Sequence, residues 1–270
     1  MVSSDSGTAL ASSAIQSNGD RARRGRLAGN VAIVTGGTRG LGLAMAGAFL
    51  QEGASVICAA RREAPLAELR AAHGDRVSVT TVDVCSADSV RSLMDAAMRR
   101  FGRVDILVSN AGVSRNGKIV DLGEREWREV LDTNLTGAFH CTKYVVPCME
   151  AAGGGRIINI SAGMSTRVAP GAAAYSASKA ALEMFTRASA VELAKKGILV
   201  NCIAPGFVNT GMYEPLRDDE RLRSRYERMM VSGRPGEPSE VAAAAVFLAS
   251  AEGSYVNGHV LEVNGGLLWS

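Results

Sequence analysis

The N-terminal half of the chain contains the sequence Val31-Ala32-Ile33-Val34-Thr35-Gly36-Gly37-Thr38-Arg39-Gly40-Leu41-Gly42, in which a short apolar run leads into a glycine-rich turn. The run has the composition of a buried strand. Glycines let a backbone approach a pyrophosphate closely, and the start of a helix favours such an anion. The spacing Gly-x-x-x-Gly-x-Gly differs from the Gly-x-Gly-x-x-Gly dinucleotide fingerprint. The sequence therefore predicts either a phosphate-binding turn or a plain tight turn between a strand and a helix.

The rest of the chain repeats the alternation of short apolar runs with longer segments of helical pattern. Such alternation is typical of a parallel sheet that is covered by helices on both faces. We expect the two longest helices at 124–150 and 173–195. The strands are predicted at 31–36, 55–60, 77–82, 104–109, 156–161, 198–203 and 259–263.

Length and charge limit the classes of protein to consider. With 270 residues, 47% of them hydrophobic, the chain can bury one large core, so we expect a single domain over residues 27–270. The net charge is +3, and residues 1–26 contribute +2 through four arginines and two aspartates, which leaves +1 on the domain. This balance gives no indication of nucleic-acid binding. The absence of an apolar run of 18 residues predicts no membrane span, and we expect a cytoplasmic protein.

Residues 1–26 are rich in Ser, Ala, Gly and Arg and lack periodicity, which predicts a disordered N-terminal extension. An organelle presequence is the alternative, although such segments are usually poor in acidic residues. The five cysteines are odd in number and widely spaced, so neither a disulfide framework nor a zinc site is expected. His73, His140 and His259 lack the spacing of metal ligands, and we predict no metal.

Tyr175 and Lys179 are the candidate catalytic pair. On a helix, the spacing of i and i+4 places the phenol and the ammonium on one face. A neighbouring cation stabilises a phenolate, so Lys179 is expected to lower the pKa of Tyr175 and to prepare it for acid–base catalysis. A chance pair on an exposed helix is the alternative, but the glycine turn upstream favours nicotinamide redox chemistry.

From Leu27 onward the chain resembles the short-chain dehydrogenase/reductase family. The matching features occur in the family's order: the turn from Thr35 to Gly42, Asp83, Asn110-Ala111-Gly112, Asn134, Tyr175 with Lys179, and Pro205-Gly206. The resemblance implies a doubly wound Rossmann fold with seven parallel strands and a nicotinamide cofactor at the carboxyl edge of the sheet. Taken alone, Asn110-Ala111-Gly112 is also compatible with turn chemistry, and Asn134 with capping or kinking a helix.

The resemblance also implies residue roles. Lys179 bonds the nicotinamide ribose, Asn134 holds a water that relays protons, Asp83 and Val84 face adenine, and Val208 and Thr210 contact the carboxamide. The predicted cofactor-binding residues, which include the glycine turn and nearby arginines, are Gly36, Thr38, Arg39, Gly40, Leu41, Gly42, Arg61, Arg62, Asp83, Val84, Asn110, Ala111, Gly112, Tyr175, Lys179, Pro205, Gly206, Val208 and Thr210.

Charge at the end of the second strand predicts the choice of cofactor. NAD-preferring enzymes carry an acidic residue there that binds the ribose 2′-hydroxyl, and this chain has Ala60. Arg61 and Arg62 follow, and Arg39 lies in the glycine turn, so guanidinium groups can flank a 2′-phosphate. We therefore predict NADPH/NADP, with solvated surface arginines as the alternative.

Ala162 departs from the family pattern. The family's usual serine, about thirteen residues before the tyrosine, donates a hydrogen bond to the substrate carbonyl, and alanine stands there in this chain. Ser161 is adjacent, but strand alternation should aim it away from the substrate, and Ser165 requires the loop to fold back. Three explanations remain: an altered and impaired form, an enzyme that recruits Ser161, Ser165 or water, and a family member without reductase chemistry.

The predicted function is NADPH-dependent reduction of a ketone to a secondary alcohol, or the reverse oxidation, with impaired activity. The alternative is an NADP-binding protein with a structural or regulatory role. A β-ketoacyl or polyketide-like substrate is favoured by resemblance, with a sugar or steroid alcohol as the other option. Residues 209–234 fit a substrate lid or ordinary helix packing. Resemblance also implies a homotetramer or homodimer formed through the helices at 124–150 and 173–195 and the last strand.

Overall fold

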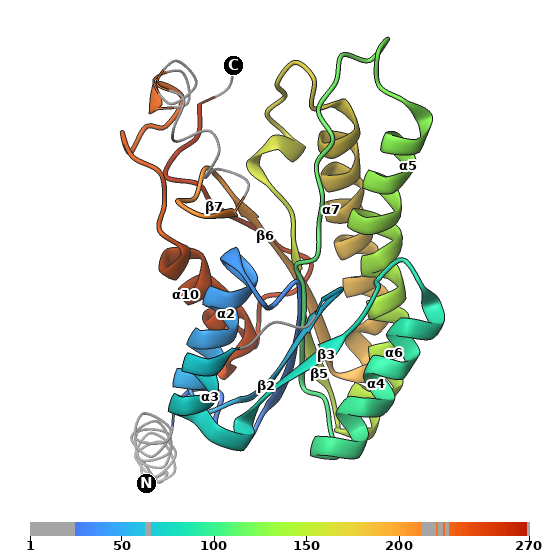
Figure 1. The fold of residues 1–270 in the computed structure, drawn as a ribbon. Helices are drawn as coiled ribbons and strands as arrows, with labels where there is room; N and C mark the ends of the chain where they lie inside the picture. Colours follow the sequence, from blue (N-terminus) through green and yellow to red (C-terminus); the bar gives the residue numbers. More distant parts are fainter. Residues whose placement is uncertain (1–24, 63–65, 212–219, 221–223, 225–226, 269–270) are drawn as a thin grey trace, which may run out of the picture.

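A computed structural model describes residues 25–62, 66–211, 220, 224 and 227–268. Its centre is one sheet of seven strands in the order β3-β2-β1-β4-β5-β6-β7, and every pairing is parallel. This arrangement confirms the predicted α/β fold (Figure 1). The strands are β1 (Val31–Thr35), β2 (Ser55–Ala60), β3 (Val77–Thr81), β4 (Ile106–Ser109), β5 (Gly155–Ile160), β6 (Ile198–Pro205) and β7 (Val260–Val263).

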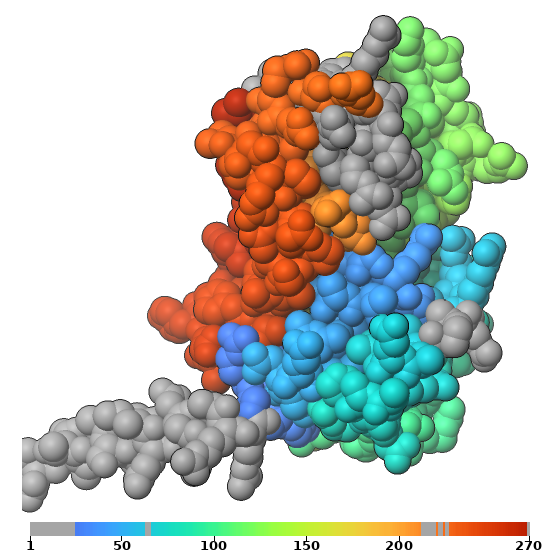
Figure 2. Space-filling view, turned by 60° about the vertical axis from the view of Figure 1, so that its left-hand side comes forward, coloured from blue at the N-terminus to red at the C-terminus, as the bar shows by residue number. Residues whose placement is uncertain are grey.

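Helices cover both faces of the sheet, as Figure 1 shows. One face carries α2 (Gly40–Gln51), α3 (Ala67–His73) and α10 (Pro238–Ala249). The other face carries α4 (Ala87–Phe101), α5 (Glu124–Leu131), α6 (Gly137–Ala151) and α7 (Ala173–Leu193). Figure 2 shows the first face, where the orange-red α10 surface borders the blue surface of α2.

Strand alternation divides the apolar residues between two cores. In β1, Ala32 and Val34 pack with α2 and α10, whereas Ile33 packs with α4 and α6. All three side chains are fully buried. Because successive side chains of a strand point to opposite faces, a strand with helices on both sides must be apolar throughout. This requirement explains why the central strands β1 and β2 contain continuous apolar runs rather than alternating ones.

The predicted strand boundaries agree with the structure to within two residues. The predicted helix at 124–150 differs more, because a π-helical turn, Asp132–Thr136, separates α5 from α6. Asn134 lies within this turn and forms side-chain hydrogen bonds to the backbone of Val113. A π-turn widens the helix by one residue and often marks a functional position.

The strand order reverses next to β1, which pairs with β2 on one side and β4 on the other. In doubly wound sheets, ligands bind in the crevice at the carboxyl ends of the strands beside such a reversal. The glycine turn follows β1 and Asn110 follows β4, so both predicted motifs lie at this crevice. Within the described part of the chain, no helix is both long and apolar enough to span a bilayer.

Candidate active site

The glycine turn is packed too closely for a side chain at Gly42. A Cβ on Gly42 would lie 2.2 Å from the carbonyl oxygen of Gly36 and 2.7 Å from Nδ2 of Asn110. Gly36 has φ of 64°, in the left-handed region that favours glycine. The helix α2 begins at Gly40, so its unpaired N-terminal amides face the crevice. This cradle fits a pyrophosphate group, both in shape and in the sign of its charge.

Asn110 joins the ends of β1 and β4. Its Nδ2 donates to the carbonyl of Thr35 at 2.9 Å. The hydroxyl of Thr35 accepts hydrogen bonds from the backbone amides of Asn110 at 2.9 Å and Ala111 at 3.0 Å. Thr35 is itself buried. The loop after β4 is therefore held against the glycine turn. Asn110-Ala111-Gly112 has a structural role in this loop and also lies at the crevice, so the two interpretations of this motif are compatible.

The remaining cofactor candidates lie at the ends of neighbouring strands. Arg61 and Arg62 follow β2 and are exposed, as is Arg39 in the glycine turn. Asp83 is exposed after β3, and its Oδ1 accepts the amide of Cys85 at 3.0 Å. Thr38 and Leu41 lie in the glycine turn, and Val84 is buried after β3. The candidates at or after the end of β6 are Pro205, Gly206, Val208 and Thr210. The candidate residues thus lie at the carboxyl ends of β1, β2, β3, β4 and β6.

Gly206 and Thr210 show how the end of β6 approaches its neighbours. A Cβ on Gly206 would lie 2.8 Å from Cα of Asn264, so the strand end requires glycine. The hydroxyl oxygen of Thr210 lies 3.6 Å from the position of a Cβ on Gly40. Thr210 therefore reaches the glycine turn from the far side of the crevice. Exposed arginines, free helix amides and close-packed glycines together fit a phosphorylated dinucleotide.

Tyr175 and Lys179 occupy one face of α7, as predicted. Lys179 is only 4% exposed, and its ammonium donates to the carbonyl of Ile160 at 2.7 Å. The same nitrogen lies 5.7 Å from the centre of the Tyr175 ring, within range of a cation–π contact. Lys179 also lies beside the loop after β4, because a Cβ on Gly112 would be 3.5 Å from its Nζ.

The predicted direction of the Tyr175 pKa was wrong. Burial raises the pKa of Tyr175 to about 12. Burial also lowers the pKa of Lys179 to about 8, because desolvation disfavours an ammonium. The i and i+4 spacing correctly placed the two groups together, but desolvation of the phenol outweighs the attraction of a cation that lies over the ring.

Asn134 is 1% exposed and connects three segments. Its Oδ1 accepts the amide of Val113 at 2.8 Å. Its Nδ2 donates to the carbonyl of Val113 at 3.0 Å and to the hydroxyl of Ser178 at 2.9 Å. Ser178 in turn donates to the carbonyl of Tyr175 at 2.7 Å. Asn134 thus holds the loop after β4 against the start of α7, next to the candidate pair of Tyr175 and Lys179.

Ser161 points away from the crevice, as strand alternation predicted. Its hydroxyl donates to Oε1 of Glu183 on α7 at 2.7 Å, and the residue is 3% exposed. Ala162 is buried in an extended conformation with no hydroxyl to offer. Ser165 lies in the short 3₁₀ turn Gly163–Ser165, where its amide donates to the carbonyl of Ala162 at 3.0 Å. Recruitment of Ser161 to the substrate would require its buried hydrogen bond to Glu183 to break.

Sequence reasoning missed two buried polar residues near the catalytic pair, Ser178 and Glu183. The spacing Tyr175, Lys179 and Glu183, each four residues apart on one helix, was a readable signal for the second. No sequence signal marks Ser178. The predicted lid lies partly outside the described residues, which include 209–211, 220, 224 and 227–234 of that segment. The N-terminal extension lies outside them up to residue 24.

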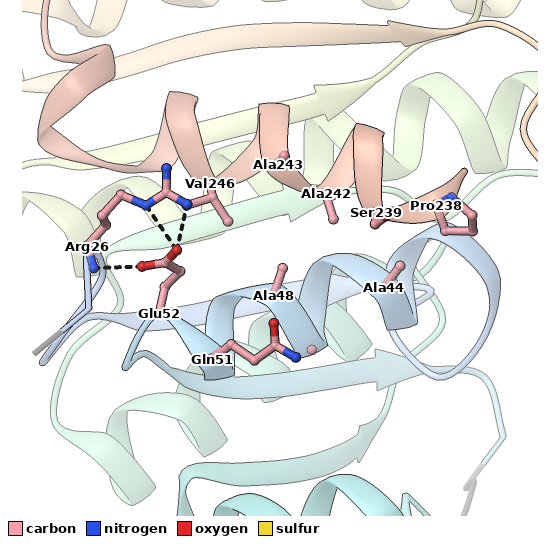
Figure 3. A pocket seen from close by; sticks show the side chains of 11 residues that line it. Arg26, Ala44, Ala48, Gln51, Glu52, Pro238, Ser239, Ala242, Ala243 and Val246 are labelled. Atoms are coloured by element: carbon pink, nitrogen blue, oxygen red, sulfur yellow. Dashed lines mark hydrogen bonds and ion pairs between the residues drawn. The ribbon is translucent and has the colours of Figure 1, made fainter. Parts of the chain in front are cut away.

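A pocket between α2 and α10 lies apart from this site (Figure 3). It is walled by small residues such as Ala44, Ala48 and Ala242. Arg26 and Glu52 form an ion pair at one end. None of the predicted catalytic or cofactor residues lines this pocket.

The cysteines form no disulfide within the described residues. All five cysteines are free, and Cys58, Cys141 and Cys202 are buried. Burial raises the pKa of each of these three thiols to about 12. Within the described ranges, no group of three or more His, Cys, Asp or Glu residues is arranged to hold a metal ion.

The parallel sheet, the close-packed glycine turn at its switch point and the buried lysine beside a tyrosine define a nicotinamide-dependent oxidoreductase of Rossmann type. Comparison with known proteins agrees with this class. Residues 36–268 match the family model described as Enoyl-(Acyl carrier protein) reductase. The chain belongs to the short-chain dehydrogenase/reductase family.

Individual relatives extend over nearly the whole domain. The chain is 39% identical over 241 residues to 3-oxoacyl-[acyl-carrier-protein] reductase FabG of Vibrio cholerae, covering 89% of this chain and 98% of the relative. It is 39% identical over 245 residues to the protein of the same name from Chlamydia muridarum, again covering 89% and 98%. The crystal structure of gox2181 superposes with a TM-score of 0.85 at 34% identity, covering 89% of this chain and 96% of that one.

Proposed function

We propose that this protein is an NADPH-dependent reductase that converts a ketone to a secondary alcohol, or catalyses the reverse oxidation. The observation that carries the proposal is the placement of Tyr175 and Lys179 on one face of α7, with the Lys179 ammonium buried beside the loop after β4. Family membership supports the reaction class. The names of the FabG relatives, which are 3-oxoacyl reductases, support the carbonyl as the reacting group.

The cofactor would be held by the carboxyl edge of the sheet. The α2 amides and glycine turn would bind the pyrophosphate, and Asp83 and Val84 would face adenine. Arg39, Arg61 and Arg62 would bind the 2′-phosphate, and we propose NADP(H) over NAD(H) on this basis. When bound, the nicotinamide supplies or accepts the hydride.

In the reducing direction, Tyr175 would donate its phenolic proton to the developing alkoxide. Because burial raises the pKa of Tyr175 to about 12, the phenol is protonated throughout the physiological range, as a proton donor must be. Lys179 would act as a cation beside the ring and bind the nicotinamide ribose. Asn134 uses one lone pair of Oδ1 on Val113, which leaves the other for the water that would relay protons.

Because Ala162 offers no hydrogen-bond donor, we expect ketone reduction to be slow rather than absent. The loss of one donor to a developing oxyanion typically costs about 10²- to 10³-fold in rate. Ser161 does not replace that donor while its hydroxyl is bonded to Glu183. The same observation favours a second candidate function, a cofactor-binding protein with a structural or regulatory role and little catalysis.

A β-ketoacyl or polyketide-like ketone is the proposed substrate class, with a sugar or steroid alcohol as the alternative. Resemblance to 3-oxoacyl reductases supports the first. For assembly we propose a homotetramer or homodimer through α5, α6 and α7 and through the last strand, β7. Phe139, Met184 and Val191 expose apolar side chains on these helices, and Ala177, Ala180 and Ala188 are exposed on α7 among them.

The test measures NADPH oxidation with a panel of ketones that includes a β-ketoacyl thioester, on the chain and on Ala162→Ser, with NADPH binding followed separately by fluorescence. A slow rate that rises in Ala162→Ser would support the reductase with an impaired donor. Tight NADPH binding without turnover in either protein would instead support the non-catalytic alternative. Equal affinity for NADH and NADPH would contradict the assignment of the arginines.

A further inference from the structure

Glu183 is a buried carboxyl group that the proposed reaction does not use. It lies one turn after Lys179 on α7, so Tyr175, Lys179 and Glu183 follow one another at intervals of four residues along one face. Glu183 is 5% exposed. Burial of an acidic side chain is unfavourable unless it is paired or hydrogen-bonded, so its partners require an explanation.

One partner is the end of β5. The Ser161 hydroxyl donates to Oε1 of Glu183 at 2.7 Å, and the Ser161 amide donates to the carbonyl of Ile203 on β6 at 2.7 Å. Lys179 meanwhile donates to the carbonyl of Ile160 at 2.7 Å. Lys179 and Glu183 thus hold consecutive residues, and the next residue along the chain is Ala162. The carboxyl group is therefore fixed in position relative to both the strand end and the lysine.

Glu183 also acts on the charge of Lys179, which lies one helical turn earlier, although the two groups form no direct ion pair within the described residues. The ionisable groups that act on this ammonium are Cys202 on β6 and Glu183 on its own helix, and Tyr175 lies under it as a neutral phenol. Burial and the neighbouring Glu183 raise the pKa of Cys202 to about 12, so its thiol is neutral at physiological pH. Of these groups, Glu183 alone can supply negative charge where desolvation works against the ammonium.

We propose that Glu183 is a positioning residue that keeps Lys179 a cation in the buried site, with Ser161 holding the carboxylate in place. This inference rests on the proposed function, in which the Lys179 cation binds the nicotinamide ribose and assists Tyr175. It also gives Ser161 a role beside the position where the family's serine is missing. The serine next to Ala162 serves the lysine rather than the substrate.

The experiment uses the full chain and follows NADPH affinity and kcat/KM for a β-ketoacyl thioester between about pH 6 and pH 10. Four variants are compared with the unchanged protein: Glu183→Gln, Ser161→Ala, Lys179→Met and Glu192→Gln. Glu183→Gln retains an acceptor for Ser161 but removes the charge. Glu192 lies exposed on the same helix and provides the matched control. Lys179→Met establishes which part of each pH profile reports on the lysine.

We expect Glu183→Gln to move the alkaline fall of both quantities to lower pH by about one unit, since a nearby charge in a protein interior acts on that scale. Ser161→Ala should shift it in the same direction by less, because the carboxylate remains but loses its anchor. Glu192→Gln should leave it unchanged. If Glu183→Gln does not fold, Ser161→Ala carries the test.

The proposal would be overturned if the pH profiles of Glu183→Gln matched those of Glu192→Gln. If Glu183→Gln does not fold, the same comparison is made with Ser161→Ala. A lower melting temperature of the variant would not change this conclusion. The binding measurement separates this outcome from failure of the proposed function. If no variant reduces a ketone, the shift in NADPH affinity still decides the role of Glu183. If ketones are reduced but neither profile moves, the reductase stands and the role of Glu183 falls.

Discussion

The carboxyl ends of β1 and β5 both open onto the crevice, yet they are built in different ways. After β1, the backbone itself forms the site, because Gly42, Gly36 and Asn110 pack so closely that a methyl group on Gly42 would collide. After β5, side chains form the site, and we infer from the spacing of thirteen residues before Tyr175 that Ala162 stands where the family usually has a serine. A cradle of main-chain atoms depends on glycines, whereas a hydrogen-bonding side chain can be lost without disturbing the fold.

We therefore expect cofactor binding and catalysis to be separable in this chain. The β1 end has the glycines and the helix N-terminus that fit a pyrophosphate, while the β5 end, on the proposed assignment of Ala162, lacks one hydrogen-bond donor. Lys179 and Glu183 still hold Ile160 and Ser161 in place. The protein should therefore bind its cofactor normally and react slowly.

Tyr175→Phe should lower kcat/KM for ketone reduction by about 10³-fold, because it removes the proposed proton donor. NADPH affinity should change by less than about threefold, because the ring and its contact with Lys179 remain. Steady-state kinetics and fluorescence binding measure the two quantities. Tyr144→Phe, which removes a hydroxyl on α6 that accepts from Arg91, is the control. A parallel loss of cofactor affinity would show that the two strand ends are not independent.

Ala162→Ser should raise kcat by about 10²-fold, because it restores a donor to the developing oxyanion. The residue is 8% exposed in extended backbone, which serine adopts without strain. NADPH affinity should stay constant. Ala71→Ser, on the exposed surface of α3, provides a comparison of the same chemistry away from the site. An unchanged rate would mean that the substrate carbonyl does not approach this strand end.

Arg61→Ala should weaken NADPH binding by about tenfold and leave NADH binding unchanged. A charge-assisted hydrogen bond to a phosphate contributes roughly 1.5 kcal/mol or more, and NADH lacks that phosphate. Titration of each cofactor measures the ratio. Arg70→Ala, at an exposed position on α3, removes the same charge outside the crevice. Equal losses for both cofactors would assign Arg61 to the shared part of the dinucleotide and leave Arg39 and Arg62 to be tested.

The pH dependence of ketone reduction should follow Lys179. Burial lowers the pKa of this ammonium to about 8, and the cation is the form proposed to act. Activity should therefore be constant at lower pH and fall as pH rises through 8, by about fourfold between about pH 7 and pH 8.5. Tyr175, with its pKa raised to about 12, remains protonated over that interval. A fall that begins only near the ordinary lysine value would contradict the desolvation of Lys179.

The arrangement of the fold was predictable because its signals are local. The central strands are apolar runs that are buried on both faces, and Gly42 is required by the carbonyl of Gly36, six residues earlier. The helix spacing placed Tyr175 and Lys179 on one face without knowledge of the rest of the chain. A kink of the helix at 124–150 by Asn134 was one of the alternatives, and the sequence did not decide between them, because the hydrogen bond between Asn134 and Val113 joins residues 21 positions apart.

By itself, the sequence determined the succession of strands and helices, the glycine turn and the pairing of Tyr175 with Lys179. The direction of the Tyr175 pKa, the hydrogen bond from Ser161 to Glu183 and the hydrogen bond from Lys179 to Ile160 follow only from the folded arrangement of the chain. The physical reason is that periodicity is a property of neighbouring residues, whereas desolvation depends on what the whole fold packs around a group. Hydrogen bonds between segments 19 and 22 residues apart have no counterpart in local pattern.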